Sequence, residues 1–260
     1  MAFSIDGIVI DRIQMGIAED FSGNVLYTLT QLADAEIAVT AESKEARDAN
    51  GTLIKTFYTG KSGTFTANNA IIDFNILAEA SGSPKEVASK TAKITMPGVM
   101  TVKVGETTVT LKGVKADTVK VVGIAGNGSL IKTYTKDTSA QENTFSISEE
   151  TLSLPTDKTP VEFVIKYERE VESGVKVSNK ANKFPKTIKL TLKALAVDPC
   201  SADQVRACLI VLPSFQVSPE TTISLQTDQQ LQYTGNLQVD YCSSDKELYS
   251  IYFAEDDIEE

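Results

Sequence analysis

The chain has 260 residues, of which 42% are hydrophobic and 23% are charged, and its formal net charge at pH 7 is -10. This composition is typical of a globular protein with enough apolar residues for one large β domain or two smaller ones. The negative charge argues against a protein that grips nucleic acid, because such affinity comes from clustered Lys and Arg side chains that neutralise phosphates.

The first residues, 1–6, contain neither a basic region nor a long apolar run, and no window is long enough to cross a bilayer. We therefore expect a protein without a membrane anchor that is made in a cytoplasm. Three cysteines, Cys200, Cys208 and Cys242, give no even disulfide framework, and all lie in or beside strand-like sequence. Buried, reduced thiols are the expected state, with a redox or metal role as the alternative.

Strand patterns dominate the start of the chain. Imperfect alternation over residues 7–17 predicts a strand with a kink, and residues 21–24 form a turn. Residues 25–30 and 31–39 follow as two further strands, the second of which runs into a long ribbon.

Residues 36–82 organise the rest of the chain. The outward arm, residues 40–48, has almost no large apolar residue, yet Asn50-Gly51 between two extended runs is a strong hairpin signal. A two-stranded ribbon is marginal in water, so we expect a neighbouring copy of the chain to complete it. A loose surface hairpin or a frayed helix are the alternatives, since Glu, Lys and Ala are helix formers.

The return arm of this hairpin, residues 52–59, has bulky residues on both faces, Leu53 and Phe57 on one and Ile54 and Tyr58 on the other. Residues 60–63 are expected to break the strand before residues 64–66.

A single helix is then expected over residues 70–80. It would be capped by Asn68 or Asn69 and stopped by Gly82. The apolar residues spaced to share one face of this helix are Ile71, Phe74, Leu77 and Ala78.

The sequence changes character between residues 99 and 182, where short segments rich in Val and Thr are separated by turns. About seven strands are expected there, at the spacing of a β-sandwich: residues 101–104, 107–111, 118–124, 130–134, 144–147, 161–167 and 174–177. Residues 126–128 read as a hairpin turn.

The last third begins with a half-buried strand in which Ile188, Leu190, Leu192 and Ala194 face one way. Further strands are expected at residues 206–212, closed by Pro213, and at 221–226, 231–241 and 248–253. Residues 255–260 form an acidic tail that we expect to be solvated.

No catalytic, cofactor-binding or metal site emerges from the sequence. The absence of histidine removes every Ser-His or Cys-His pair and the commonest metal ligand. Gly60-Lys61-Ser62 resembles the end of a phosphate-binding loop, but Lys55 stands where that motif needs Gly. The three cysteines lack the fourth ligand that a closed zinc site needs. Because none of these patterns supplies catalytic chemistry, we expect that the protein is not an enzyme.

Three stretches together resemble the tail tube proteins of tailed bacteriophages. They are residues 55–67, residues 167–193 with Asn179 and Phe184-Pro185, and residues 198–248 with Asp198-Pro-Cys200, Val239-Asp-Tyr-Cys242 and Lys246-Glu-Leu248. The resemblance implies a mainly β chain with a β-sandwich or barrel-like tail-tube fold, one short helix and a long β-hairpin. It further implies six-membered rings that stack, in the virion tail after assembly in the host cytoplasm, around a channel through which DNA passes without tight binding. Other phage tail proteins are the implied further partners.

On this hypothesis residues 1–95 and 181–260 form the tube-like core. Residues 96–180 are either part of the same sandwich or an added immunoglobulin-like module. The residues expected to mediate assembly through the hairpin and the helix are Thr40, Glu42, Lys44, Arg47, Asn50, Gly51, Lys55, Phe57, Tyr58 and Phe74. Two alternatives remain: a capsid decoration or head-tail connector protein, and a soluble binding module that acts through turns such as residues 126–129.

Overall fold

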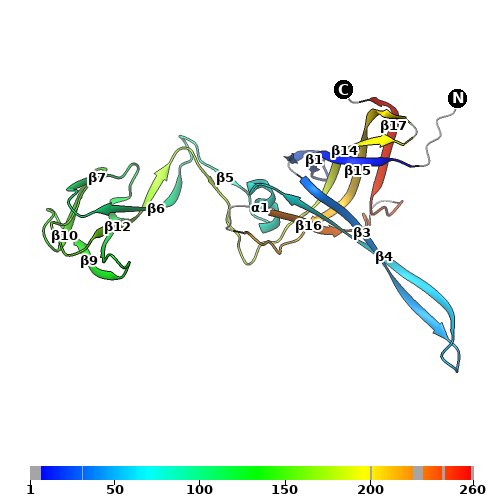
Figure 1. The fold of residues 1–260 in the computed structure, drawn as a ribbon, viewed down its shortest axis with the longest axis horizontal. Helices are drawn as coiled ribbons and strands as arrows, with labels where there is room; N and C mark the ends of the chain where they lie inside the picture. Colours follow the sequence, from blue (N-terminus) through cyan, green and yellow to red (C-terminus); the bar gives the residue numbers. More distant parts are fainter. Residues whose placement is uncertain (1–6, 31, 200, 225–230, 242–243, 259–260) are drawn as a thin grey trace. The chain divides into compact units, whose positions relative to one another are not determined.

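The computed structural model describes residues 7–30, 32–199, 201–224, 231–241 and 244–258. It confirms a mainly β chain, and the described residues contain one α-helix (Figure 1). The chain divides into two compact units, Met1–Lys85 with Val177–Glu260, and Glu86–Lys176. Each unit is described below by itself.

The first unit is built on one eight-stranded sheet. Seven strands follow the order β2-β1-β14-β15-β16-β4-β3, and β17 pairs with β15 off this path. The strands are β1 (Val9–Glu19), β2 (Val25–Leu29), β3 (Leu32–Arg47), β4 (Leu53–Asn69), β14 (Thr187–Asp198), β15 (Ser201–Val217), β16 (Leu231–Leu237) and β17 (Ser250–Ile258).

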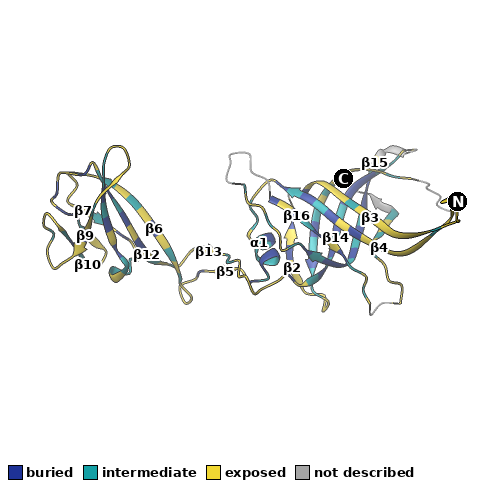
Figure 2. Cartoon of the chain, turned by 90° about the horizontal axis from the view of Figure 1, so that it is seen from below, coloured by how far each residue is buried: buried dark blue, intermediate teal, exposed yellow. Residues whose placement is uncertain are grey.

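Alternation along these strands places one face of the sheet in the core. Ile188, Leu190, Leu192 and Ala194 of β14 are all buried on the same face, as predicted from their spacing. Figure 2 shows buried residues alternating with more exposed ones along the strands of this sheet. The expected kink in β1 is also present, since its register with β14 shifts twice, between Ile10 and Arg12 and between Ile13 and Met15.

An aromatic cluster ties three strands together in this core. Phe65 of β4 packs edge to face against Phe215 of β15 and Tyr233 of β16, with ring centroids 5.8 and 6.1 Å away. The Tyr233 hydroxyl lies 3.0 Å from the hydroxyl of Tyr27. Burial raises the pKa of both phenols, so the pair stays neutral and hydrogen-bonded instead of carrying charge into the core.

The helix starts later than the sequence suggested. Helix α1 spans Phe74–Ser81, and its N-cap is Asp73, whose carboxylate accepts the Asn75 amide at 2.7 Å. Asn68 and Asn69 do not cap it because they end strand β4, opposite β16. The expected stop at Gly82 is confirmed, in the left-handed conformation with φ 60°.

The buried face of the helix also differs from the expected one. Ile76 and Ala80, four residues apart, are buried in the core, whereas Ile71 and Phe74 are exposed. Of the predicted face, Leu77 packs half-buried against the core, whereas Ile71 lies before the helix and Phe74 at its exposed first position.

Strand β4 is longer than expected, because Gly60, Lys61 and Ser62 do not break it. Gly60 pairs with Glu42 beside a register shift in β3, and Gly63 is buried under Leu237. A glycine at a bulge or under a close neighbour interrupts the side chains of a strand without interrupting its hydrogen bonds.

Strand β15 likewise continues through Pro213. This proline lies at a register shift between β14 and β15, where its missing backbone N–H does not interrupt the hydrogen bonds between the strands. Strand β16 ends at Leu237, short of the expected residue 241. Residues 221–224 form one isolated bridge, Ile223 with Leu231, in place of the expected strand, whose remainder lies outside the described residues.

The C-terminal acidic segment is partly strand, and the predicted solvation of its side chains lies outside the described residues. Strand β17 continues through residues 255–258, and Ile258 pairs with Arg206. Cys208 is free and buried, as expected, whereas Cys200 and Cys242 lie outside the described residues.

The second unit has its own sheet and its own core. Its seven-stranded sheet has the order β6-β12-β8-β9-β10-β11-β7. These strands are β6 (Ile94–Lys103), β7 (Thr108–Thr110), β8 (Lys120–Ile124), β9 (Leu130–Lys136), β10 (Thr144–Ser148), β11 (Thr151–Ser153) and β12 (Glu162–Val171), with the 3-10 turn η1 (Ala116–Thr118) before β8. The expected turn at residues 126–128 joins β8 to β9 and places Gly128 at φ 81°.

Two short strands, β5 (Glu86–Val87) and β13 (Val175–Lys176), pair where the chain enters and leaves the second unit. The core of this unit is separate from that of the first and includes Leu111, Phe145, Leu152, Phe163 and Ile165.

A buried carboxylate, Asp157, anchors one end of the second unit. It accepts hydrogen bonds from the Thr159 amide at 2.8 Å and the Tyr134 hydroxyl at 2.8 Å, and the Lys132 ammonium lies 3.3 Å away. The hydrogen bonds from Thr159, with those from Tyr134 and Lys132, hold the pKa of Asp157 well below its ordinary value. They therefore stabilise the ionised form in the folded state.

This anchor predicts acid sensitivity of the second unit. Because the folded-state pKa of Asp157 is depressed, its stabilisation is fully present above the ordinary value of 3.8 and is lost as the pH falls through the folded pKa. In Asp157→Asn that pH dependence should disappear, together with some stability at neutral pH. Hydrogen exchange of β9 and β12 from neutral to acidic pH measures this, with the exposed Asp117→Asn as the matched control. An unchanged pH profile in Asp157→Asn would contradict the assignment.

Candidate assembly surface

Strands β3 and β4 continue beyond the sheet as a two-stranded ribbon. They pair from Leu32 opposite Asn69 to Arg47 opposite Leu53, whereas β16 covers β4 only between Gly63 and Asn69. Residues 40–62, called the ribbon below, therefore have no third strand among the described residues, and Figure 1 shows them extending away from the sheet. Such an element leaves both of its faces and both of its edges open.

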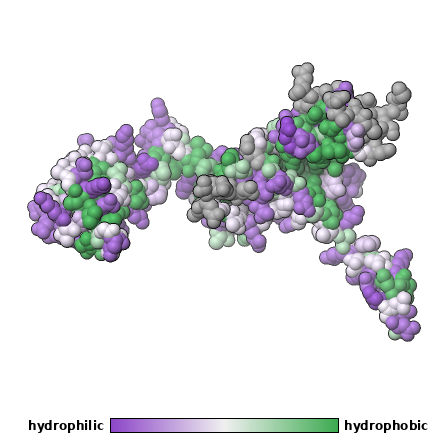
Figure 3. Space-filling model, in the orientation of Figure 1, coloured by the Kyte–Doolittle hydropathy of each residue, from purple (hydrophilic) through white to green (hydrophobic). Residues whose placement is uncertain are grey.

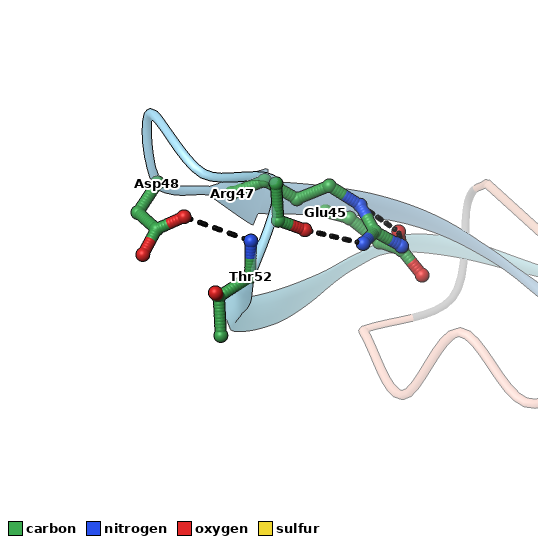
Figure 4. A network of polar contacts seen from close by, with 5 residues as sticks. Glu45, Arg47, Asp48 and Thr52 are labelled. Carbon is green, nitrogen blue, oxygen red and sulfur yellow. Dashed lines mark hydrogen bonds and ion pairs between the residues drawn. The ribbon is translucent and has the colours of Figure 1, made fainter.

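The predicted turn at Asn50-Gly51 closes the ribbon, and Asp48 organises it. The Asp48 carboxylate accepts the amides of Asn50 at 2.9 Å and Thr52 at 2.8 Å, the second of which appears in Figure 4. Gly51 has φ 83°, a conformation that a residue with a Cβ rarely adopts. The tip is thus a defined turn instead of a loose loop.

Arg47 is already engaged within the ribbon. Its guanidinium donates to the Glu45 carboxylate at 2.6 and 3.0 Å and to the Gly51 carbonyl at 2.8 Å (Figure 4). The ion pair is exposed and contributes at most about 1 kcal/mol, so its effect is mainly to orient the turn.

Removing the Asp48 acceptor should loosen the tip without unfolding the protein. Asp48→Ala leaves the Asn50 and Thr52 amides without their partner, a loss of about 1 kcal/mol, or roughly fivefold in local opening. Amide hydrogen exchange at these two positions measures the change. Asp48→Asn keeps the acceptor oxygen and serves as the control, and equal exchange in both variants would contradict this role.

The outer half of the ribbon exposes large apolar side chains on both faces. Phe57 and Tyr58, which follow each other in the strand opposite Lys44 and Ser43, face opposite ways and are 51% and 74% exposed. Leu53 and Ile54, at the register shift beside the turn, are 47% and 68% exposed. Figure 3 shows hydrophobic side chains gathered near the end of the ribbon. Four such residues on a segment with no core of its own form the kind of surface that is buried by a partner.

The polar members of the predicted set lie along the same ribbon. Thr40 and Ser62 face each other across the strands with their hydroxyls 3.0 Å apart, and Glu42 pairs in register with Gly60. Lys44 lies opposite Phe57, and the Lys55 ammonium lies 5.2 Å from the centre of the Phe57 ring.

The structure therefore brings nine of the ten predicted assembly residues into one element and places the tenth, Phe74, on helix α1. Leu53 and Ile54 were not in the predicted set, although their exposure matches that of Phe57 and Tyr58. A sequence signal for Leu53 and Ile54 did exist. They are apolar residues at successive positions of an arm that has nothing to pack against.

Metal-binding clusters and membrane-spanning helices do not occur in the described part of the chain. Among the described residues, no group of three or more Cys, Asp or Glu side chains is placed to hold a metal ion. Within the described ranges, none of the helical structure is both long and apolar enough to span a bilayer.

The β-rich fold therefore extends a two-stranded ribbon that no third strand covers among the described residues. The family model described as the YomU/Tube protein family matches residues 9–248, and the chain belongs to this family, which is of the phage tail tube type. It is accordingly a tube-type structural protein of a bacteriophage and a component of the virion tail. No curated protein matches the chain significantly.

Proposed function

We propose that copies of this chain assemble through the ribbon into hexameric rings, and that the rings stack into a tube through which DNA passes. The observation that carries the proposal is the ribbon itself, a two-stranded element with four exposed apolar side chains and no covering strand among the described residues. A ring of identical subunits offers each ribbon the same neighbour, which satisfies every copy at once.

The role proposed is structural and not enzymatic, with no cofactor. DNA would move through the channel without being held, because the chain carries 35 acidic and 25 basic residues and no histidine. A wall of net negative charge repels phosphates, so the polymer slides instead of sticking. Other tail proteins would contact the two ends of the tube, where the last ring has no neighbour of its own kind.

Electron microscopy of the purified protein at rising concentration, with size-exclusion chromatography of the same samples, tests this proposal. We expect rings or hollow filaments above a threshold concentration. The matched control replaces residues 41–61 by a two-residue turn, which joins the paired residues Thr40 and Ser62 and leaves the pairing of β4 with β16 intact.

Three other outcomes would overturn the proposal. A protein that stays monomeric at every concentration but coats preformed capsids would be a decoration or connector protein. A monomer whose ligand binding is lost on removal of residues 96–180 would be a binding module. Filaments that form equally well without the ribbon would show that assembly uses another surface.

A further inference from the structure

The outer face of β4 and β16 differs in chemistry from the rest of the sheet. These two strands turn apolar residues such as Phe65, Tyr233 and Leu237 into the core. Their opposite face carries only hydroxyl and amide side chains, called the amide-hydroxyl face below: Thr64, Thr66, Asn68, Gln232, Thr234 and Asn236. All six are partly or fully exposed.

Pairing brings these residues into adjacent rows. Gln232 lies opposite Asn68, Thr234 opposite Thr66 and Asn236 opposite Thr64, so the face is one continuous surface.

Hydrogen bonds extend the amide-hydroxyl face on both sides. The Gln238 amide, next along the chain after β16, donates to the side-chain oxygen of Gln216 of β15 at 2.7 Å, and the Gln216 amide donates to the Pro185 carbonyl at 3.0 Å. On the β3 side, the Asn68 amide donates to Asp34 at 3.3 Å. These amide side chains are therefore held by one another, by a backbone carbonyl and by the Asp34 carboxylate.

This part of the sheet contains no basic residue. Over residues 32–39, 63–69 and 231–238 the charged side chains are Asp34 and Glu36, both acidic and both on the edge strand β3, whereas Lys61 and Glu42 lie further out, in the ribbon. The other half of the same sheet differs, because β14 carries Lys189 and Lys193 on its outer face. The β14 half of the sheet therefore carries cations, one of them paired with Glu19 at 3.5 Å, whereas the β4 and β16 half offers phosphates nothing that neutralises charge.

We propose that the amide-hydroxyl face is the wall of the channel that DNA touches, and that its edge of carboxylates on β3 repels the phosphates. This inference rests on the tube proposed above. Amide and hydroxyl groups keep a water layer and bind phosphate oxygens only weakly compared with Lys or Arg, so the duplex meets a hydrated surface without fixed cations. The carboxylates of β3 are then the part of the chain's acidic excess that lies beside this wall.

The test places lysines on this face and asks where they hold DNA. Subunits carrying Thr64→Lys and Asn236→Lys are assembled in the presence of short duplex DNA and treated with a nuclease too large to enter a channel sized for one duplex. Wild-type filaments should retain no protected DNA. Filaments of the double variant should retain protected DNA, with log affinity falling against log salt by about 0.9 for each phosphate that an added lysine neutralises. The matched control adds two lysines to the second unit, Val99→Lys and Thr133→Lys, and should protect none.

The outcomes distinguish the assignment of the channel wall from the proposal that the chain forms a tube. Filaments of the double variant whose DNA is digested as in the control would overturn the wall assignment and leave the tube standing. Wild-type protein that forms no filaments would overturn both.

Thr64→Cys covers the case in which the added lysines prevent assembly. A small maleimide should label this variant in filaments above the background of the native cysteines. A maleimide linked to a bulky folded protein should label only dissociated subunits. Labelling of intact filaments by the bulky reagent would overturn the assignment.

Discussion

Aspartate at both Ile54 and Tyr58 is expected to abolish filament formation while leaving each subunit folded. Both side chains are exposed in the subunit, 68% and 74%, so the substitution removes almost no burial and should change the free energy of unfolding by less than about 0.5 kcal/mol. Burying each side chain against a neighbour is worth about 1.5–3 kcal/mol, and the added carboxylates would oppose that burial. The concentration threshold for assembly should rise by roughly a hundredfold or more. Sedimentation velocity measures the threshold and chemical denaturation measures the stability.

The matched control for this experiment is Val99→Asp. Val99 lies on β6 of the second unit and is 68% exposed, the same fraction as Ile54, so this variant adds a carboxylate at an exposed apolar position while the ribbon is untouched. Its assembly threshold should stay within a factor of about two of wild type, a difference of less than about 0.5 kcal/mol. Equal loss of assembly in both variants would mean that added charge alone, and not the ribbon, controls association.

Features fixed by neighbouring residues could be predicted from the sequence. The hairpin at Asn50-Gly51 depends on a glycine with positive φ and on the Asp48 side chain, which bonds to amides two and four residues away, so every part of it is local. The half-buried strand that begins at Thr187 could be predicted equally well, because strict alternation of apolar and polar residues over eight positions indicates a strand with one buried face.

Features fixed by distant partners could not be predicted. Gly60 and Gly63 look like breakers in the sequence, but β4 persists because β3 and β16, the latter more than 160 residues away in the chain, supply its hydrogen bonds. The start of helix α1 was misplaced for the same reason: pairing with β16 holds Asn68 and Asn69 in the strand and leaves Asp73 as the first residue able to cap.

The assembly surface was predictable in part. The outward arm, which has almost no large apolar residue, indicated a ribbon that needs a partner. The resemblance to tail tube proteins indicated that this partner is another copy of the chain. The amide-hydroxyl face was not predictable, because it arises only when Thr64, Thr66 and Asn68 are aligned with Gln232, Thr234 and Asn236 by pairing. Each segment alone is an ordinary polar and apolar alternation.

Phe65→Ala is expected to destabilise the first unit by about 3–5 kcal/mol, a large part of the roughly 5–15 kcal/mol available to a typical domain. Phe65 is 1% exposed and packs against both Phe215 and Tyr233, so its loss leaves a cavity where β4, β15 and β16 meet. Denaturation followed by hydrogen exchange should show loss of protection in β4 and β16. Phe65→Leu keeps most of the apolar volume and should cost less than about 1.5 kcal/mol.

The same substitution also tests how the ribbon is held. Phe65 lies two residues from Gly63, where β16 stops covering β4, so the cavity should loosen the root of the ribbon as well as the core. Phe65→Ala should then lower both filament formation and the free energy of unfolding. The double aspartate variant at Ile54 and Tyr58 differs, because it should lose filament formation alone. Phe163→Ala, the equivalent loss in the core of the second unit, should lower protection of β8 and β12 and leave β4 and β16 unchanged. If Phe163→Ala weakened β4 as much as Phe65→Ala does, the two cores would unfold as one unit, and stability of the ribbon root could not be assigned to the aromatic cluster.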